Sequence, residues 1–118
     1  MARSFKNLVD LYEQSCKDFA DRELFGTKHD GGWSYITYAD FRAQVDDFRA
    51  GLARLGIGAG DRVAIVADNC IEWAVAAYAT YGLRAAFVPM YEAQSPDEWI
   101  FILNDCKAKL VIASKSAI

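Results

Sequence analysis

Residues 60–89 constrain the fold more than any other stretch, because they have the pattern of a strand, a helix and a second strand. Residues 63–67 form an unbroken apolar run, typical of a strand buried on both faces of a parallel sheet. A helix is expected over residues 69–81 and a strand over residues 85–88. A helix of about 12 residues is ~18 Å long and matches a short strand, so the chain can cross over to a parallel neighbour.

The predicted helix has an N-terminal signal in Asn69, which is followed three residues later by Glu72, and an expected C-terminal stop at Gly82. Its side chains are apolar almost all the way round, with only Glu72 and Thr80 polar. A helix of this kind is normally buried on every side.

We therefore expect one face of this helix to pack on the strands of residues 63–67 and 86–88. The other face is expected to pack against an element encoded after Ile118. An isolated chain would then hide the uncovered face by self-association, which Tyr78→Glu should weaken.

The remaining elements follow from local signals. Residues 4–20 have apolar side chains at spacings of three and four, which predicts an amphipathic helix docked on the domain. Two β-prone runs, residues 24–28 and 33–36, flank an Asp-Gly turn and predict a hairpin. A second helix starts at Thr37, where Asp40 completes a capping box, and ends at Gly56.

A further helix starts at Ser95, with Pro96 at its first position and Glu98 three residues after the cap. A strand over residues 110–113 follows. The predicted fold class is α/β, with a parallel βαβαβ core, an N-terminal helix and a β-hairpin. Residues 1–118 have room for a single domain.

Composition narrows the function classes. The net charge of −3 does not favour a nucleic-acid partner, and the uncharged run at residues 73–83 is too short for a membrane span of ~20 residues. Charged residues before any early apolar run argue against a signal peptide. The three cysteines (Cys16, Cys70 and Cys106) form no Cys-x-x-Cys pair and are interpreted as buried thiols of a cytoplasmic protein.

The motifs that could carry chemistry are few. The glycines at residues 56–60 follow a helix and lead into a strand, so they do not form a phosphate-binding loop. The single histidine, His29, lies in the predicted turn and is expected at the surface. There is no Cys/His cluster for a metal and no nucleophile elbow. Three tryptophans are interpreted as core: Trp33, Trp73 and Trp99.

Polar residues lie where two predicted strands end. Asp68 and Asn69 follow the first strand of the core, and Tyr91 and Glu92 follow the second. In open α/β sheets, ligands bind outside the carboxyl ends of the strands. We interpret Asn69 mainly as a helix cap, and no residue is assigned as catalytic or as a metal ligand.

An ordered series of motifs runs through the chain: Trp33-Ser-Tyr-Ile-Thr-Tyr38, Gly60-Asp-Arg-Val-Ala-Ile65, Asn69-x-x-Glu-Trp73, Val88-Pro-Met-Tyr91 and Ile102-Leu-Asn-Asp105. In order and spacing, this series resembles the N-terminal part of the AMP-forming acyl-CoA synthetases. The Asn-x-x-Glu-Trp and Val-Pro-x-Tyr forms are most similar to long-chain fatty acid CoA ligases. Two positions depart from the pattern: Arg84 stands where glycine is usual, and Cys70-Ile71 stands where Arg-Pro is frequent.

The resemblance implies a parent enzyme that uses ATP, Mg²⁺ and CoA. A fatty acid and ATP would give an acyl-adenylate and pyrophosphate, and CoA would then displace AMP. The family's Ser/Thr/Gly-rich loop, Thr-Glu motif, ribose-binding Asp and C-terminal lysine do not occur in residues 1–118. The chain is therefore expected to be an inactive N-terminal fragment of a cytoplasmic enzyme, with any membrane association made by the missing part. The alternative is a free-standing α/β interaction or nucleotide-binding module.

Overall fold

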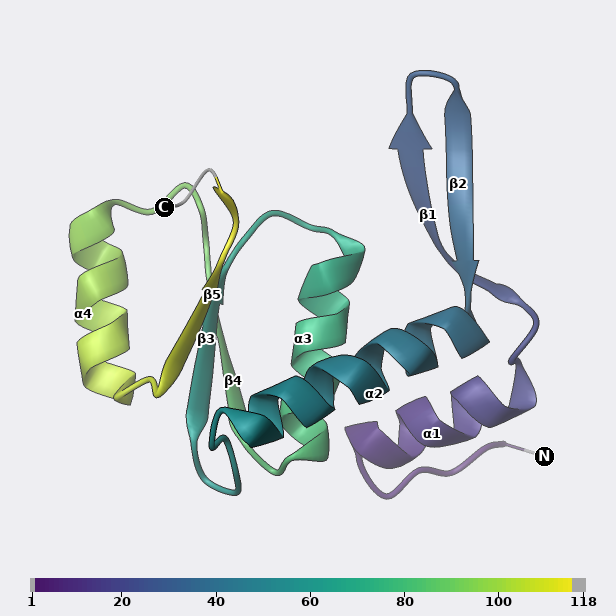
Figure 1. Ribbon diagram of the computed structural model, residues 1–118, viewed down its shortest axis with the longest axis horizontal. Helices are drawn as coiled ribbons and strands as arrows, with labels where there is room; N and C mark the ends of the chain where they lie inside the picture. The colour runs from purple at the N-terminus through teal and green to yellow at the C-terminus, as the bar shows by residue number, and fades with distance from the viewer. Residues whose placement is uncertain (1, 116–118) are drawn as a thin grey trace.

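The computed structural model describes residues 2–115 and has at its centre a parallel sheet of three strands, in the order β4-β3-β5. One helix covers each face of this sheet (Figure 1). The elements of this layer are β3 (Arg62–Val66), α3 (Ile71–Gly82), β4 (Ala86–Met90), α4 (Pro96–Cys106) and β5 (Leu110–Ala113). The predicted parallel α/β core is confirmed.

The N-terminal elements lie on the α3 side of the sheet (Figure 1). They are α1 (Leu8–Asp18), the antiparallel strands β1 (Glu23–His29) and β2 (Gly32–Thr37), and α2 (Tyr38–Arg54). Helices α1 and α2 pack on α3, whereas the hairpin projects from the body of the molecule. The predicted first helix was too long at both ends: the helix begins only after the cap that Asn7 provides, and it ends at Asp18 with Phe19 as its C-cap.

Strand β3 is the centre of the core. Val63 and Ile65 are almost fully buried, as is the intervening Ala64. Val63 belongs to the cluster shared with α1, α2 and α3, and Ala64 belongs to the cluster under α4. The strand is thus buried on both faces, as its unbroken apolar run predicts.

The second face of α3 is covered by α1 and α2 of the same chain, so the expectation of a covering element after Ile118 is wrong. Val75 and Ala79 of α3 pack in one cluster with Phe41, Val45 and other residues of α1 and α2. Tyr78, which we expected on a free face, lies against Tyr12 with the ring centroids 5.2 Å apart. The amphipathic faces of two preceding helices provide the cover that we had placed downstream.

Two of the predicted helix N-caps form as expected, and a third does not. Thr37 with Asp40, and Ser95 with Glu98, form complete capping boxes, as predicted. Asn69 does not cap α3: the N-cap position is taken by Cys70, with no side-chain hydrogen bond to the helix. The sequence prediction therefore placed the N-cap of α3 one residue too early, although Asn69 and Glu72 have the spacing of a capping box.

The helix ends differ in a similar way. Gly56 ends α2 with φ +89°, as predicted, and the amide of Ile57 donates to the carbonyl of Leu52 at 3.1 Å. Gly82, in contrast, is the last residue of α3 and not its stop. The left-handed position after α3 is taken by Arg84 with φ +59°. A Cβ on Gly82 would lie 3.0 Å from the Arg49 side chain, so this glycine permits the close approach of α2.

Two predictions about single residue types were only partly right. Trp73 and Trp99 are half-buried, but Trp33 is 59% exposed on the hairpin and stacks on Tyr35. All three thiols are free: Cys16 is buried, but Cys70 is exposed. His29 is exposed as expected and makes a hydrogen bond with Ser34.

The hydroxyl of Tyr12 gives a first prediction. Tyr12 is 7% exposed and its hydroxyl has no hydrogen-bond partner among residues 2–115. Burial also raises the pKa of this hydroxyl, because the charged form is desolvated. Tyr12→Phe should increase the free energy of unfolding by about 1 kcal/mol, measured by urea denaturation, because it removes an unsatisfied buried polar group. The exposed Tyr35→Phe is the control; a destabilising Tyr12→Phe would show that the hydroxyl has a partner.

The left-handed backbone conformation of Arg84 gives a second prediction. An L-residue in this conformation costs about 1–2 kcal/mol, partly offset by the extra freedom that glycine adds to the unfolded chain. Arg84→Gly should therefore raise the free energy of unfolding by about 0.5–1 kcal/mol. Gly56→Ala, at the equivalent position after α2, should lower it by a similar amount. If both substitutions changed the free energy of unfolding in the same direction and by the same amount, the assignment of backbone strain to Arg84 would be contradicted.

Candidate functional site

The carboxyl edge of the sheet gathers the polar residues that follow the three strands. Asp68 and Asn69 come after β3, Tyr91 and Glu92 come after β4, and Ser114 comes after β5. Because the strands are parallel, their carboxyl ends meet at this single edge. The structure thus brings together the residues that the sequence placed at separate strand ends.

A cavity of about 400 Å³ opens at this edge, with Trp73 on one side. The residues that line it are Ala67, Asp68, Asn69, Trp73, Pro89, Met90, Tyr91 and Glu92. The loop after β4 is held by local contacts: the Trp99 indole donates to the carbonyl of Tyr91 at 2.8 Å, and the Tyr91 amide donates to the Gln94 side chain at 3.1 Å. Tyr91 itself is 79% exposed, so its ring is available at the rim.

Two carboxyl groups face each other at this edge. The hydrogen bond that the protonated Asp68 carboxyl donates to Glu92, and secondly the negative charge of Glu92, raise the pKa of Asp68 above its usual value of 3.8. The Ser114 hydroxyl donates to the Glu92 carboxylate and so connects the end of β5 to the loop after β4. Ser114 is the member of this group that the sequence analysis missed, because nothing before the fold shows that β5 ends beside Glu92.

The chemistry available at this edge is that of two carboxyl groups, beside the neutral donors and acceptors of Asn69 and Tyr91. The lining contains no lysine, arginine or histidine. Phosphate groups require donors and positive charge, so this cavity does not suit the phosphates of a nucleotide. Among residues 2–115 there is also no group of three or more His, Cys, Asp or Glu side chains that could hold a metal ion.

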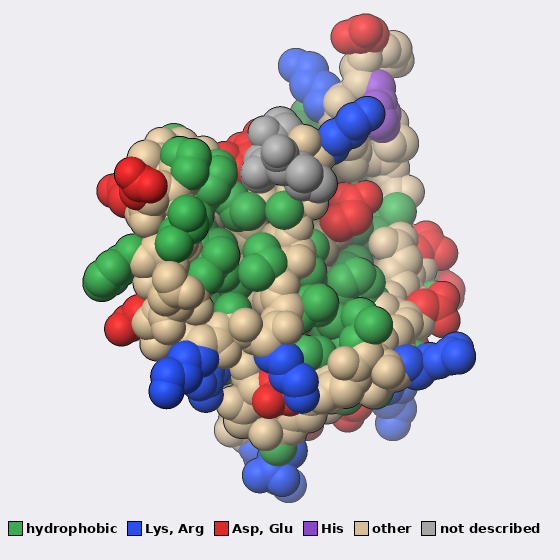
Figure 2. Space-filling view, turned by 60° about the vertical axis from the view of Figure 1, so that its left-hand side comes forward, with side chains coloured by type: hydrophobic (Ala, Val, Ile, Leu, Met, Phe, Trp, Pro, Cys, Tyr) green, Lys and Arg blue, Asp and Glu red, His purple; other side chains and the backbone are tan. Residues whose placement is uncertain are grey.

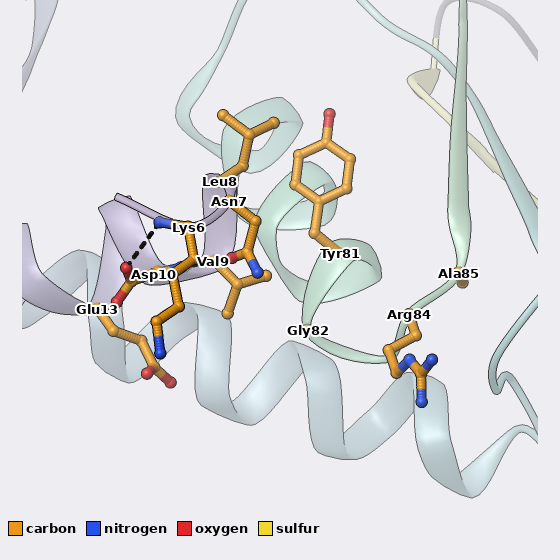
Figure 3. A pocket seen from close by; sticks show the side chains of 10 residues that line it. All are labelled: Lys6, Asn7, Leu8, Val9, Asp10, Glu13, Tyr81, Gly82, Arg84 and Ala85. Atoms are coloured by element: carbon orange, nitrogen blue, oxygen red, sulfur yellow. Dashed lines mark hydrogen bonds between the residues drawn. The ribbon is translucent and has the colours of Figure 1, made fainter. Parts of the chain in front are cut away.

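A larger depression of about 710 Å³ lies on another part of the surface, where the start of α1 meets the end of α3 (Figure 3). Lys6, Asp10 and Glu13 line it from the α1 side, and Tyr81 and Arg84 line it from the α3 side. The side-chain amide of Gln14 and, secondly, the backbone amide of Lys6 each donate to the Asp10 carboxylate at 3.0 Å, and these bonds lower the pKa of Asp10. The Arg84 guanidinium points away from the α1 side chains, so the two cations do not converge on one ligand (Figure 3).

Comparison with known proteins decides the family. Residues 12–118 match the family of AMP-binding enzymes. The chain belongs to this family. The match includes both the sheet and the helices that cover it, so it applies to almost all of the described structure.

Curated relatives include long-chain-fatty-acid–CoA ligases. One is the FadD15 ligase of Mycobacterium tuberculosis, 33% identical over 107 residues, which are 91% of this chain and 18% of that protein. Another is the ligase of Thermus thermophilus, 31% identical over 106 residues, which are 90% of this chain and 20% of that protein. The chain therefore spans about a fifth of the length of these relatives.

Solved structures show the same arrangement. The Mycobacterium tuberculosis fatty acyl CoA synthetase superposes with a TM-score of 0.87 at 28% identity, over 95% of this chain and 22% of that one. A long-chain-fatty-acid CoA ligase of Rhodopseudomonas palustris, described as putative in its name, gives 0.81 at 32% identity, over 92% and 27%. The α/β arrangement of this segment is thus shared with adenylate-forming CoA ligases.

The carboxyl pair provides a prediction about pH. The pKa of Asp68 is raised in the folded chain, so the folded state loses stability as the pH rises from 3.8 through the raised pKa. Asp68→Asn removes this penalty. The urea midpoint of the variant should exceed that of the natural chain at pH 7, and the difference should vanish as the pH falls to about 3.8.

The exposed Asp21→Asn is the matched control, because Asp21 lies in the turn between α1 and β1 and does not line the cavity at the carboxyl edge. It should leave the pH dependence of the midpoint unchanged. A gain for Asp68→Asn that is constant from pH 3.5 to pH 7 would show that the pair does not share a proton.

Proposed function

We propose that the chain is part of a fatty acid CoA ligase. The observation that supports this most strongly is the match of residues 12–118 to the AMP-binding enzymes, together with relatives named as long-chain-fatty-acid–CoA ligases at 31–33% identity. The parent would activate a fatty acid with ATP to an acyl-adenylate, and CoA would then take the acyl group.

The residues that hold ATP, Mg²⁺ and CoA are proposed to lie outside residues 1–118. The cavity at the carboxyl edge is lined by Asp68 and Glu92 and by no cation, which is the reverse of what a polyphosphate requires. Residues 1–118 would then be one piece of a larger domain. They would have a structural role in the parent enzyme and no ligase activity by themselves.

The cellular setting is also a proposal. None of the helices described for residues 2–115 is long and apolar enough to cross a membrane. Free thiols agree with a reducing compartment. We place the parent in the cytoplasm, with any membrane association made by other parts of the protein. We also propose that the 118-residue chain self-associates when isolated, because several large apolar side chains are exposed.

The experiment compares two proteins. The first is the longer protein encoded by the gene, incubated with ATP, Mg²⁺, CoA and fatty acids of several lengths; it should release pyrophosphate and AMP and form acyl-CoA. The second is the 118-residue chain, which should release no pyrophosphate above a no-protein control and should show no binding of ATP, AMP or CoA by calorimetry.

The outcomes separate the two hypotheses. A gene that ends after Ile118, or a longer protein without ligase activity on any carboxylic acid, would overturn the ligase assignment. Tight nucleotide binding by residues 1–118 alone would favour the free-standing nucleotide-binding module instead.

A further inference from the structure

Helix α1 packs on α2 and α3 through few side chains. Its two buried residues are Tyr12 and Cys16. The Tyr12 ring contacts Phe41 of α2, with the ring centroids 5.9 Å apart, and Tyr78 of α3, with the centroids 5.2 Å apart. These apolar contacts are the centre of the interface between α1 and the rest of the domain. Figure 1 shows α1 lying alongside α2, on the side of α3 away from the sheet.

Polar bonds do not add to this attachment. The hydrogen bonds and the ion pair made by residues 3–18 all stay within residues 3–19. Within the part of the chain that the structure describes, none of these bonds reaches residues 20–115. A helix of 11 residues, such as α1, is below the ~12–15 residues at which even a good helix former is marginally stable alone in water. Both the docking and the helical state of α1 therefore depend on the packing around Tyr12 and Cys16.

The packing under α1 is incomplete. A cavity of about 200 Å³ lies between α1, β1, α2 and α3, and Tyr12, Cys16 and Tyr78 are part of its wall. Side chains that border a cavity lack the dispersion contacts that a filled core provides. The Tyr12 hydroxyl is buried without a hydrogen-bond partner among residues 2–115, and it would regain water if α1 moved away. Both features lower the free energy needed to separate α1 from α2 and α3.

The chain directly after α1 is fixed more firmly. The carbonyls of Ala20 and Arg22 accept hydrogen bonds from the amides of Ala39 and Tyr38, each at 3.0 Å. The ring of Phe19 also lies against the ring of Tyr38, with the centroids 5.8 Å apart. Phe19 is the C-cap of α1. A movement of α1 would therefore pivot at this residue, where the loosely held segment meets the anchored one.

We infer that α1 is a detachable cover, which separates from α2 and α3 as a unit and pivots at Phe19 while the sheet and the other helices stay folded. Proteins open locally in cooperative units of this kind, with free energies below that of global unfolding. Opening exposes the face of α3 that carries Tyr78. It also exposes the thiol of Cys16, which is 3% exposed in the closed state. The domain thus has an apolar surface that is accessible only when α1 is open.

The thiol of Cys16 reports on this opening. The full-length protein encoded by the gene is treated with dilute iodoacetamide, and the tryptic peptide of residues 7–17 is followed by mass spectrometry. Burial shields Cys16 and raises the pKa of its thiol, so it should react only after α1 opens. The exposed Cys70 gives the rate of an accessible thiol in the same sample. The labelling rate of Cys16 should change little with urea below the unfolding transition, because local opening exposes little new surface.

Two variants separate local opening from unfolding of the whole domain. Leu103→Ala removes packing between α4 and the sheet, far from α1, and should lower the free energy of unfolding. It should nevertheless leave the labelling rate of Cys16 within about twofold of the natural rate, because α1 opens without α4. Tyr12→Phe should slow the labelling of Cys16 by about fivefold, because the side chain no longer gains a hydrogen bond to water on opening. If Leu103→Ala does not fold, the urea dependence of the natural protein decides the same question.

Hydrogen exchange checks the extent of the opening. The amides of residues 12–16 in α1 should exchange at one common opening free energy, which is lower than that of residues 75–79 in α3. Equal protection of the two helices would overturn the inference. So would a Cys16 rate that rises about tenfold or more in Leu103→Ala, or one that follows the full urea dependence of global unfolding. None of these readouts involves ATP, so the ligase assignment is tested separately.

Discussion

The packing of α3 between the sheet and α2 is the contact on which the other elements depend. Small side chains make it close: Ala76, Ala77 and Ala79 are almost fully buried, and Gly82 lies against Arg49 of α2. Phe41 of α2 is in turn the contact for Tyr12 of α1 and Phe25 of the hairpin. Each large apolar side chain buried in this way contributes about 1.5–3 kcal/mol, so this packing is a main source of stability for the N-terminal elements.

The parallel sheet also decides where chemistry can be placed. Three strands that run in one direction bring their following loops to one edge, and here that edge supplies carboxylates, a hydroxyl and an exposed tyrosine. Such groups accept hydrogen bonds and do not neutralise negative charge. The properties of this segment are those of a scaffold with a polar rim, which agrees with a segment that spans about a fifth of its relatives.

Local signals in the sequence predicted the features that depend on neighbouring residues, such as the starts of two helices. Thr37 with Asp40 and Ser95 with Glu98 act within four residues, so their capping boxes needed no knowledge of the rest. The covering of α3 depends on contacts between residues far apart in the sequence, and it was wrongly assigned to a downstream element. Arg84 illustrates the same limit: the family resemblance leads us to expect glycine at its position, but only the structure shows the left-handed backbone that favours glycine there.

The order of the strands could have been predicted from Pro89, which the sequence analysis used only to end a strand. A strand between two neighbours needs its backbone donors on both sides, so Pro89 already places β4 at an edge. The run of residues 63–67, apolar without a break, requires cover on both faces and suits the centre. β5 must then pair with β3 on the side away from β4. Both faces of the sheet are covered by helices of residues 2–115, and within that range only the outer edges of β4 and β5 remain unpaired.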